Sequence, residues 1–173
     1  MALSNEQKYI RKAMLLGAIS SILAILFSWY LSKFIQIKPH QNIPLRIEIF
    51  ALGMFLAILP MVIMIGKIAG MRFFSIGIDG SSTKLIDISV KILNNTHEQT
   101  LLFMIASLAL TISIPEDRLA MTPILAVFFI LARMNFWYSY YNNAIKRAYG
   151  FAATFYMSIL ILVCSIFFYM KYQ

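Results

Sequence analysis

Five long apolar stretches, separated by short polar segments, follow one another along the chain. None shows the strict alternation of apolar and polar positions that is typical of a strand. About 20 apolar residues in a helix suffice to cross the hydrocarbon core of a bilayer. We therefore predict an all-α protein with five membrane spans, at residues 13–36, 47–69, 85–114, 119–143 and 148–170. Pro60 lies inside the second stretch and should bend that helix.

The third stretch, residues 85–114, differs from the others because its first half is polar. Thirty residues of helix are about 45 Å long, whereas the hydrocarbon core is about 30 Å thick. The first turns of this helix should therefore stand in the headgroup region. That position accounts for Lys84, Asp87 and Lys91, but not fully for Asn95 and Glu98, which lie further into the helix.

Composition supports a membrane protein. Hydrophobic residues make up 61% of the 173 positions and charged residues 13%, against about 45–50% and about 25% in soluble domains. In so apolar a chain, the net charge of +8 indicates basic loops at a membrane surface rather than nucleic-acid binding.

The lysine and arginine counts predict the orientation. With the N-terminus inside, nine basic residues lie on the cytoplasmic side: Lys8, Arg11, Lys12, Lys67, Arg72, Lys84, Lys91, Lys146 and Arg147. The opposite side receives five: Lys33, Lys38, Arg46, Arg118 and Lys171. We therefore expect a cytoplasmic N-terminus and a C-terminus outside.

Two of the predicted helices carry polar stripes near the same cytoplasmic end. Lys91, Asn95 and Glu98 are spaced i, i+4, i+7 and share one helix face at about 100° per residue. Arg133, Trp137 and Tyr140 share a face of the fourth helix, and Arg147 would join it if that helix continued so far. His97 points away from the first stripe, and we expect it to be a packing or interfacial residue.

A charge such as Arg133 inside a membrane helix needs a partner or a wet cavity. Glu98 is the expected partner, and two interpretations stay open. The two residues form a buried ion pair that fixes helix register, or both stripes line a pocket for a polar, anionic ligand. No zinc-protease, Ser/His/Asp, phosphate-loop or cysteine-cluster motif is present, so we expect no metal.

Three segments together resemble the MAPEG family, the membrane-associated proteins of eicosanoid and glutathione metabolism. KILNNTHEQTLLF, around Glu98, resembles the family's second helix. ARMNFWYSYY, which contains Arg133 and Tyr140, resembles its third helix, and RAYGF, beginning at Arg147, resembles the start of its fourth. The form NNTHEQ is similar to bacterial members. The order and spacing of the three segments carry the resemblance.

This resemblance implies a four-helix bundle at residues 47–173, preceded by an additional transmembrane helix within residues 1–46. It also implies a homotrimer in a bacterial inner membrane, with glutathione as co-substrate between subunits near the cytoplasmic face. The glutathione-binding residues would be Lys91, Asn95, Glu98, Arg133 and Tyr140. Arg147 would be the catalytic residue that stabilises the thiolate.

The leading hypothesis is a glutathione-dependent transferase or peroxidase that acts on small lipophilic electrophiles or lipid hydroperoxides, in detoxification. The alternative is a non-catalytic lipid-binding or scaffold protein of the same fold. Two departures from the family pattern favour the alternative: Lys91 replaces an arginine, and Phe136 stands where several members have tyrosine or histidine. A transporter is a third hypothesis, although the chain has no repeated halves.

Overall fold

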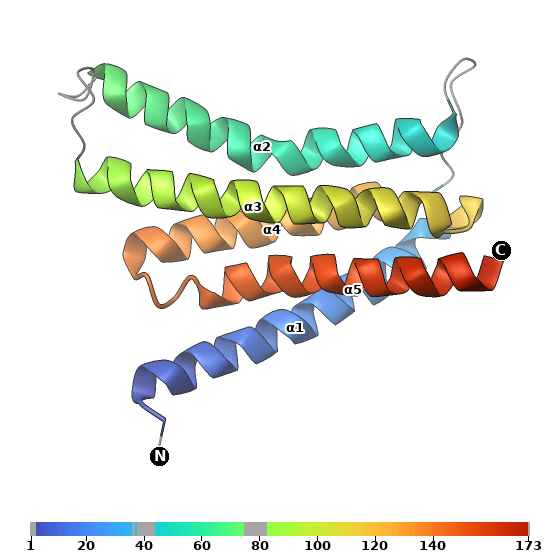
Figure 1. The fold of residues 1–173 in the computed structure, drawn as a ribbon, viewed down its shortest axis with the longest axis horizontal. Coiled ribbons are helices and arrows are strands. Elements are labelled where there is room, and N and C mark those ends of the chain that lie inside the picture. Colours follow the sequence, from blue (N-terminus) through green and yellow to red (C-terminus); the bar gives the residue numbers. More distant parts are fainter. Residues whose placement is uncertain (1–2, 36, 38–43, 75–82, 173) are drawn as a thin grey trace.

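The computed structural model describes residues 3–35, 37, 44–74 and 83–172, and in these ranges the chain is helical without strands. Five long helices follow in order, with a short 3-10 helix before the fourth (Figure 1). They are α1 (Asn5–Ser32), α2 (Leu45–Phe74), α3 (Lys84–Ser113), η1 (Glu116–Arg118), α4 (Met121–Asn142) and α5 (Ala148–Tyr172). The prediction of an all-α bundle is confirmed.

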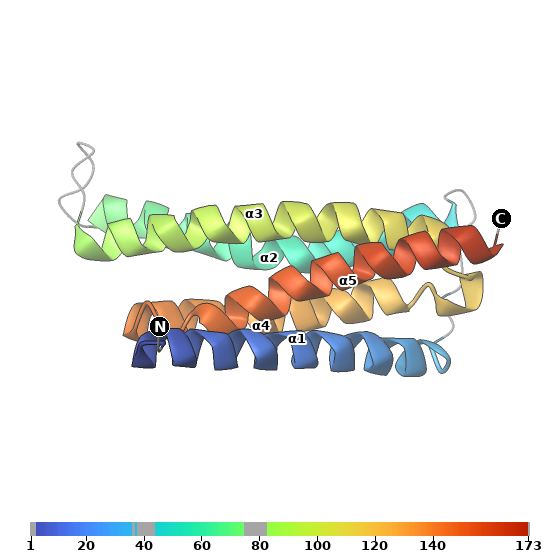
Figure 2. The ribbon, with the colours of Figure 1, turned by 60° about the horizontal axis from the view of Figure 1, so that its bottom comes forward.

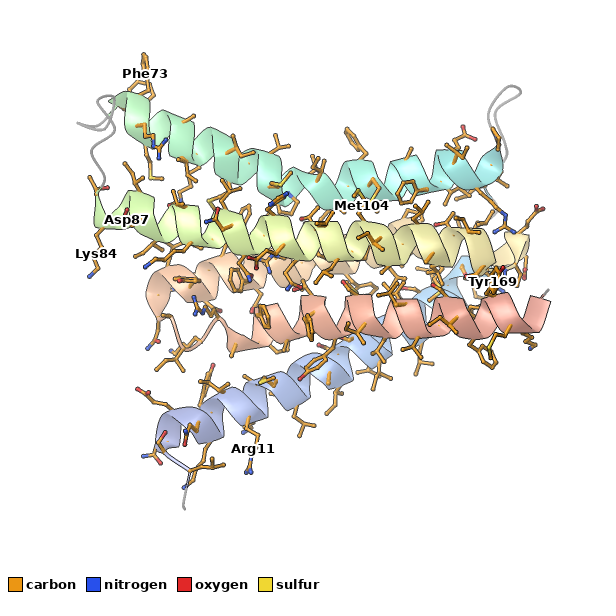
Figure 3. The ribbon with its side chains drawn as sticks, in the orientation of Figure 1. Arg11, Phe73, Lys84, Asp87, Met104 and Tyr169 are labelled. Carbon is orange, nitrogen blue, oxygen red and sulfur yellow. The ribbon has the colours of Figure 1, made fainter. Side chains whose placement is uncertain are left out.

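The helices run up and down, so that successive ends alternate between the two ends of the bundle (Figure 1). The N-terminus shares one end with the starts of α3 and α5 and the last turns of α2 and α4. Arg11 and Lys84 lie at this end, and Tyr169 lies at the other (Figure 3). This topology brings the nine basic residues of the predicted cytoplasmic side to one end, which we call the basic end.

Four of the helical segments are long and apolar enough to cross a membrane: Asn5–Ser32, Leu45–Phe74, Glu116–Asn142 and Ala148–Lys171. The third predicted span, now α3, is as long as α2 at 30 residues. It falls short by composition because its first half carries charges such as Lys91 and Glu98. It nevertheless lies alongside the apolar helices (Figure 1).

α2 is a continuous helix that bends near its middle (Figure 1). Pro60 lies in its interior and is buried. A proline removes one backbone hydrogen bond and its ring crowds the preceding turn, which accounts for the bend.

The core lies around α3, which packs against α2, α4 and α5. The Phe103 ring of α3 stacks on Phe129 of α4, with ring centroids 4.6 Å apart. Further toward the end opposite the basic end, the hydroxyls of Thr111 and Thr122 lie 3.0 Å apart. Hydroxyl pairs of this kind connect helices where no water reaches their donors.

α1 packs against α5 and α4 through a face of small residues (Figure 2). A Cβ on Gly17 would lie 2.6 Å from the Cβ of Ala152, so only glycine permits this approach. The Ser21 hydroxyl lies 2.8 Å from the Gly17 carbonyl and 2.9 Å from the Ala153 carbonyl. The first helix is therefore in close contact with α5 around Gly17.

Candidate functional site

The polar stripe of α3, made of Lys91, Asn95 and Glu98, lies on the helix face that is turned away from the bundle core. Lys91 and Glu98 are exposed and Asn95 is half-buried, whereas the neighbouring Ile92 and Thr96 are fully buried. A helix that is polar on its outer face and buried on its inner face places these three side chains side by side. The prediction that they share a face agrees with this arrangement.

Arg133 of α4 is fully buried, with 0% of its surface exposed. Its Nη2 donates to Asn95 Oδ1 at 3.1 Å and to Thr96 Oγ1 at 2.8 Å, and its Nη1 donates to Thr154 Oγ1 at 3.5 Å. The guanidinium also lies 4.1 Å above the Phe136 ring. Three helices thus meet at this one cation.

The predicted ion pair between Arg133 and Glu98 is wrong, since none joins these two described residues. Arg133 faces the buried side of α3, at Thr96. Glu98 lies on the outer face of α3, about one turn beyond Asn95; its side chain is exposed and attracts Arg133 only from beyond ion-pair distance. The arginine is solvated by an amide and two threonine hydroxyls instead of by a carboxylate.

The bond from Arg133 fixes the orientation of the Asn95 amide. A guanidinium only donates, so the oxygen of Asn95 must face Arg133. The NH₂ group of Asn95 is then turned away from Arg133, and no hydrogen bond within the described residues uses its hydrogens. Arg133 itself has no exposed surface.

Thr96 is the second partner that fixes this arrangement. Its Oγ1 donates to the Ile92 carbonyl at 2.7 Å and accepts from Arg133 and from Trp137 Nε1, the latter at 3.1 Å. The hydroxyl therefore has no spare capacity. The sequence does not distinguish Thr96 or Thr154 from other threonines, because a threonine inside a membrane helix most often bonds its own backbone.

Arg147 and Tyr140 lie together at the connection between α4 and α5. The Arg147 guanidinium stacks 4.4 Å above the Tyr140 ring. Gly150 allows this because a Cβ there would lie 2.6 Å from the Phe136 backbone nitrogen, so the first turn of α5 fits against α4 only with glycine. Tyr140 in turn packs on a buried cluster that includes Ile92 of α3.

Arg147 keeps its hydrogen-bonding capacity. Its side chain is exposed, and within the part of the chain that the structure describes it has the ring contact with Tyr140 and no hydrogen bond to protein. Lys91 and Glu98 are likewise without an ion pair there. The basic end therefore offers two cations, a carboxylate and an oriented amide, which is what a peptide with several carboxylates and an ammonium group can bind.

The sequence model of the MAPEG family matches residues 47–167. This match covers α2, α3 and α4 and most of α5, and it leaves α1 outside. No curated protein and no solved structure matches the chain.

Proposed function

The chain belongs to the MAPEG family, and we propose that it is a membrane-bound glutathione-dependent transferase or peroxidase. The family match supports the conclusion that this is a membrane protein, and the MAPEG family is associated with glutathione in general. Its substrates would be small lipophilic electrophiles or lipid hydroperoxides that enter from the bilayer. The observation that carries this proposal is the Asn95 amide, which buried Arg133 turns so that its NH₂ is available beside exposed Lys91 and Glu98.

The proposed binding residues match the charges of the tripeptide. Lys91 would bind a carboxylate, Asn95 would donate to a carbonyl or carboxylate, and Glu98 would accept from the ammonium group. Tyr140 would donate from the neighbouring helix. Arg133, the remaining residue expected in the glutathione set, would act by holding Asn95 in place.

Arg147 is the proposed catalytic residue because its donors are unused in the described structure. A free thiol has a pKa of about 8.5, and lowering it by about two units takes about 2.7 kcal/mol of preferential thiolate stabilisation. One guanidinium in a partly dry site can supply that energy.

The thiolate would react in one of two ways. In conjugation, the sulfur forms a bond to an electrophilic carbon and the leaving group departs with the electron pair of its bond. In peroxide reduction, two glutathione molecules are oxidised to the disulfide, while a hydroperoxide is reduced to an alcohol and water.

We also propose that the protein is a homotrimer with a cytoplasmic N-terminus, in the inner membrane of a bacterium. Beyond Glu98, the exposed face of α3 continues with Leu101, Ile105 and Leu108. A helix face that is charged in one half and apolar in the other is costly against lipid and favourable against another subunit. A neighbouring copy would cover the stripe and enclose the ligand.

Purified protein with glutathione and a chlorinated aromatic tests the proposal directly. We expect conjugate to form at millimolar glutathione and the thermal unfolding temperature to rise with glutathione concentration. A protein that neither binds glutathione nor turns over the aromatic or a lipid hydroperoxide would contradict it.

The second candidate is a non-catalytic lipid-binding or scaffold member. Phe136 favours it: this ring is buried beneath Arg133 and contacts Tyr140 edge-on at 5.7 Å, where several relatives of the family carry a polar side chain. Lipid that remains bound through purification, together with an unfolding temperature that glutathione does not change, would favour this candidate over the enzyme.

A further inference from the structure

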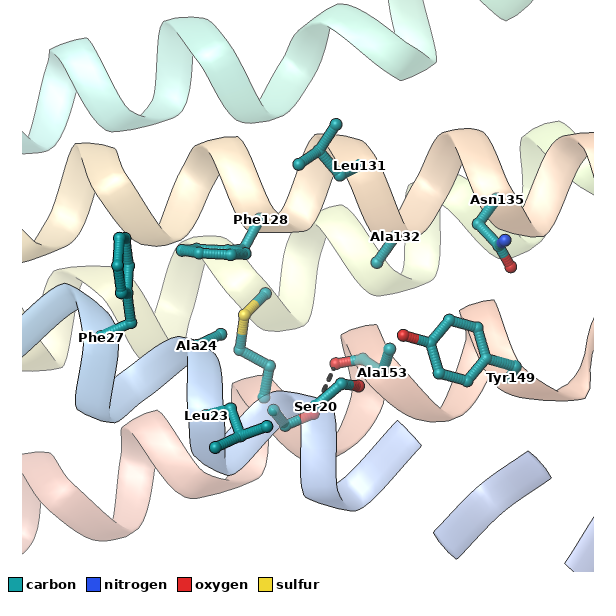
Figure 4. Close-up of a pocket in the computed structure, with 12 residues that line it drawn as sticks. Ser20, Leu23, Ala24, Phe27, Phe128, Leu131, Ala132, Asn135, Tyr149 and Ala153 are labelled. Atoms are coloured by element: carbon teal, nitrogen blue, oxygen red, sulfur yellow. Dashed lines mark hydrogen bonds between the residues drawn. The ribbon is translucent and has the colours of Figure 1, made fainter. Parts of the chain in front are cut away.

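A groove of about 660 Å³ lies between α1, α4 and α5 (Figure 4). Its volume falls within the range of about 300–1,000 Å³ that small-molecule sites occupy. The lining residues come from α1 (Ser20, Ser21, Leu23, Ala24, Phe27), α4 (Phe128, Leu131, Ala132, Asn135) and α5 (Tyr149, Ala153, Met157). Because α1 lies outside the residues that match the family, this groove depends on the additional helix.

The groove is lined mostly by apolar side chains, and two aromatic rings meet at one end. Phe27 of α1 meets Phe128 of α4 edge-on, with ring centroids 5.9 Å apart. Leu23 and Leu131 form the rim, and 59% and 60% of their surfaces are exposed. In a bilayer this opening faces hydrocarbon, so the occupant enters from the membrane.

The other end of the groove is polar. Asn135 and Tyr149 direct an amide and a hydroxyl into it (Figure 4), and in the described ranges neither side chain forms a hydrogen bond. Ser20 and Ser21 do not compete for a ligand in the same way, because their hydroxyls bond the Gly17 and Ala153 carbonyls.

The polar end of the groove lies toward the basic end of the bundle, where α5 begins. Tyr149 is the second residue of α5, and exposed Lys146 lies three residues before it. From Phe128 to Asn135 the groove follows α4 for seven residues, about 10 Å, within a leaflet whose hydrocarbon is about 15 Å deep. A lipid in its ordinary orientation would thus have its headgroup beside Asn135 and Tyr149 and its chain against the two phenylalanines.

We propose that this groove binds an anionic phospholipid, with one acyl chain between α1 and α4 and the phosphate at Asn135 and Tyr149, next to the connection that carries Lys146. Concavity on three helices distinguishes the site from ordinary lipid contact. The free donors of Asn135 and Tyr149 suit a phosphate, and the positive charge of Lys146 favours an anionic headgroup over a zwitterionic one. The site is independent of the proposed glutathione chemistry, since it uses none of the same residues.

Native mass spectrometry of the full-length protein tests the proposal, after detergent has removed bound lipid. Titration with phosphatidylglycerol should add one tightly held lipid per chain, at least fivefold tighter than phosphatidylcholine. Ala132→Phe, which fills the groove, should weaken this binding at least tenfold. Leu26→Phe is the matched control, because Leu26 is 60% exposed on α1 and does not line the groove.

A second variant tests the headgroup end. Asn135→Leu combined with Tyr149→Phe should keep the acyl chain bound but reduce the preference for phosphatidylglycerol to less than twofold. A wild-type protein that binds both lipids equally, or a free fatty acid in preference to either, would overturn the proposal. So would an Ala132→Phe protein that is folded, with wild-type helicity, and still retains the lipid.

Photocrosslinking keeps the proposal testable if the filled variant does not fold. A phosphatidylglycerol with a diazirine in its acyl chain should label wild-type protein within residues 20–27 and 128–135. Labelling spread evenly over the apolar helices would show annular lipid only and would overturn the proposal.

Discussion

The two ends of the bundle use their cations in opposite ways. At the end that holds the C-terminus, Arg46 donates to carbonyls of the last turn of α3, at 2.9 Å to Ile114 and 3.2 Å to Ile112. Arg118 donates to the Trp29 carbonyl at 3.0 Å and stacks 4.6 Å above the Trp29 ring. These cations satisfy backbone groups that helix ends leave open, and their role is structural.

At the basic end, three charged side chains of the described chain keep their hydrogen-bonding groups open. Lys91, Glu98 and Arg147 are exposed, and for the described residues no hydrogen bond or ion pair occupies them. Arg133 is the exception at this end, since it is buried and bonded like the structural arginines. The comparison indicates that the cations of the two ends differ in whether protein groups accept hydrogen bonds from them within the described chain.

Loss of Arg133 should have the largest effect. Arg133→Ala leaves a buried cavity and removes the donor from Asn95 and Thr154, so we expect about 3–5 kcal/mol lower free energy of unfolding. Denaturant titration in detergent micelles, followed by helicity, measures it. The control is Lys146→Ala, an exposed cation at the same end, which should change stability by less than about 0.5 kcal/mol. Equal effects of the two variants would show that Arg133 is not the hub that its contacts indicate.

Arg147→Ala should separate chemistry from stability. We expect about a 100-fold lower kcat/KM, equivalent to about 2.7 kcal/mol, because the pKa of the bound thiol rises. The ultraviolet absorbance of the thiolate as a function of pH should show that rise, while the unfolding temperature stays the same. An unchanged titration of the bound thiol would remove Arg147 from the mechanism.

Arg46→Ala should lower stability and leave glutathione binding unchanged, the reverse of what we expect for Arg147→Ala. It removes the donors to the last turn of α3, which we expect to cost about 1.5–3 kcal/mol of stability, as for hydrogen bonds from a charged group. Glutathione affinity should remain within twofold of wild type, because Arg46 lies at the end of the bundle opposite the stripe. A large loss of affinity would mean that the two ends are coupled.

Much of the fold could be predicted from the sequence, because helix length and apolarity are local properties. Apolar stretches of the right length predicted all five helices. Because successive helices run in opposite directions, the predicted topology also brought the nine basic residues to one end. Spacing alone also predicted that Lys91, Asn95 and Glu98 share a face. Such arguments are reliable wherever one helix is considered by itself.

The partner of Arg133 could not be predicted, because it depends on how two helices are rotated against each other. Complementary charge favoured Glu98, but packing turns Arg133 toward Thr96 on the buried face of α3 and toward half-buried Asn95 beside it, and both accept its hydrogens. Nor does any sequence pattern indicate Thr154, which reaches the same cation from α5. Polar contacts between helices are a property of packing and appear only when the whole bundle is assembled.

The smallest effect is expected for Lys91→Arg. This substitution tests the basic end by strengthening glutathione binding instead of weakening it. Lys91→Arg replaces a point charge with a fork that can bind a carboxylate through two hydrogen bonds. The side chain is exposed, so the change costs no packing, and glutathione should bind about three- to tenfold tighter, equivalent to about 0.7–1.4 kcal/mol. Lys84→Arg, also exposed on α3, is the control and should leave the affinity measured by calorimetry unchanged. If both variants bind glutathione like the wild type, Lys91 does not contact a carboxylate of glutathione. The exposed charges Lys91, Glu98 and Arg147 would then bind some other ligand.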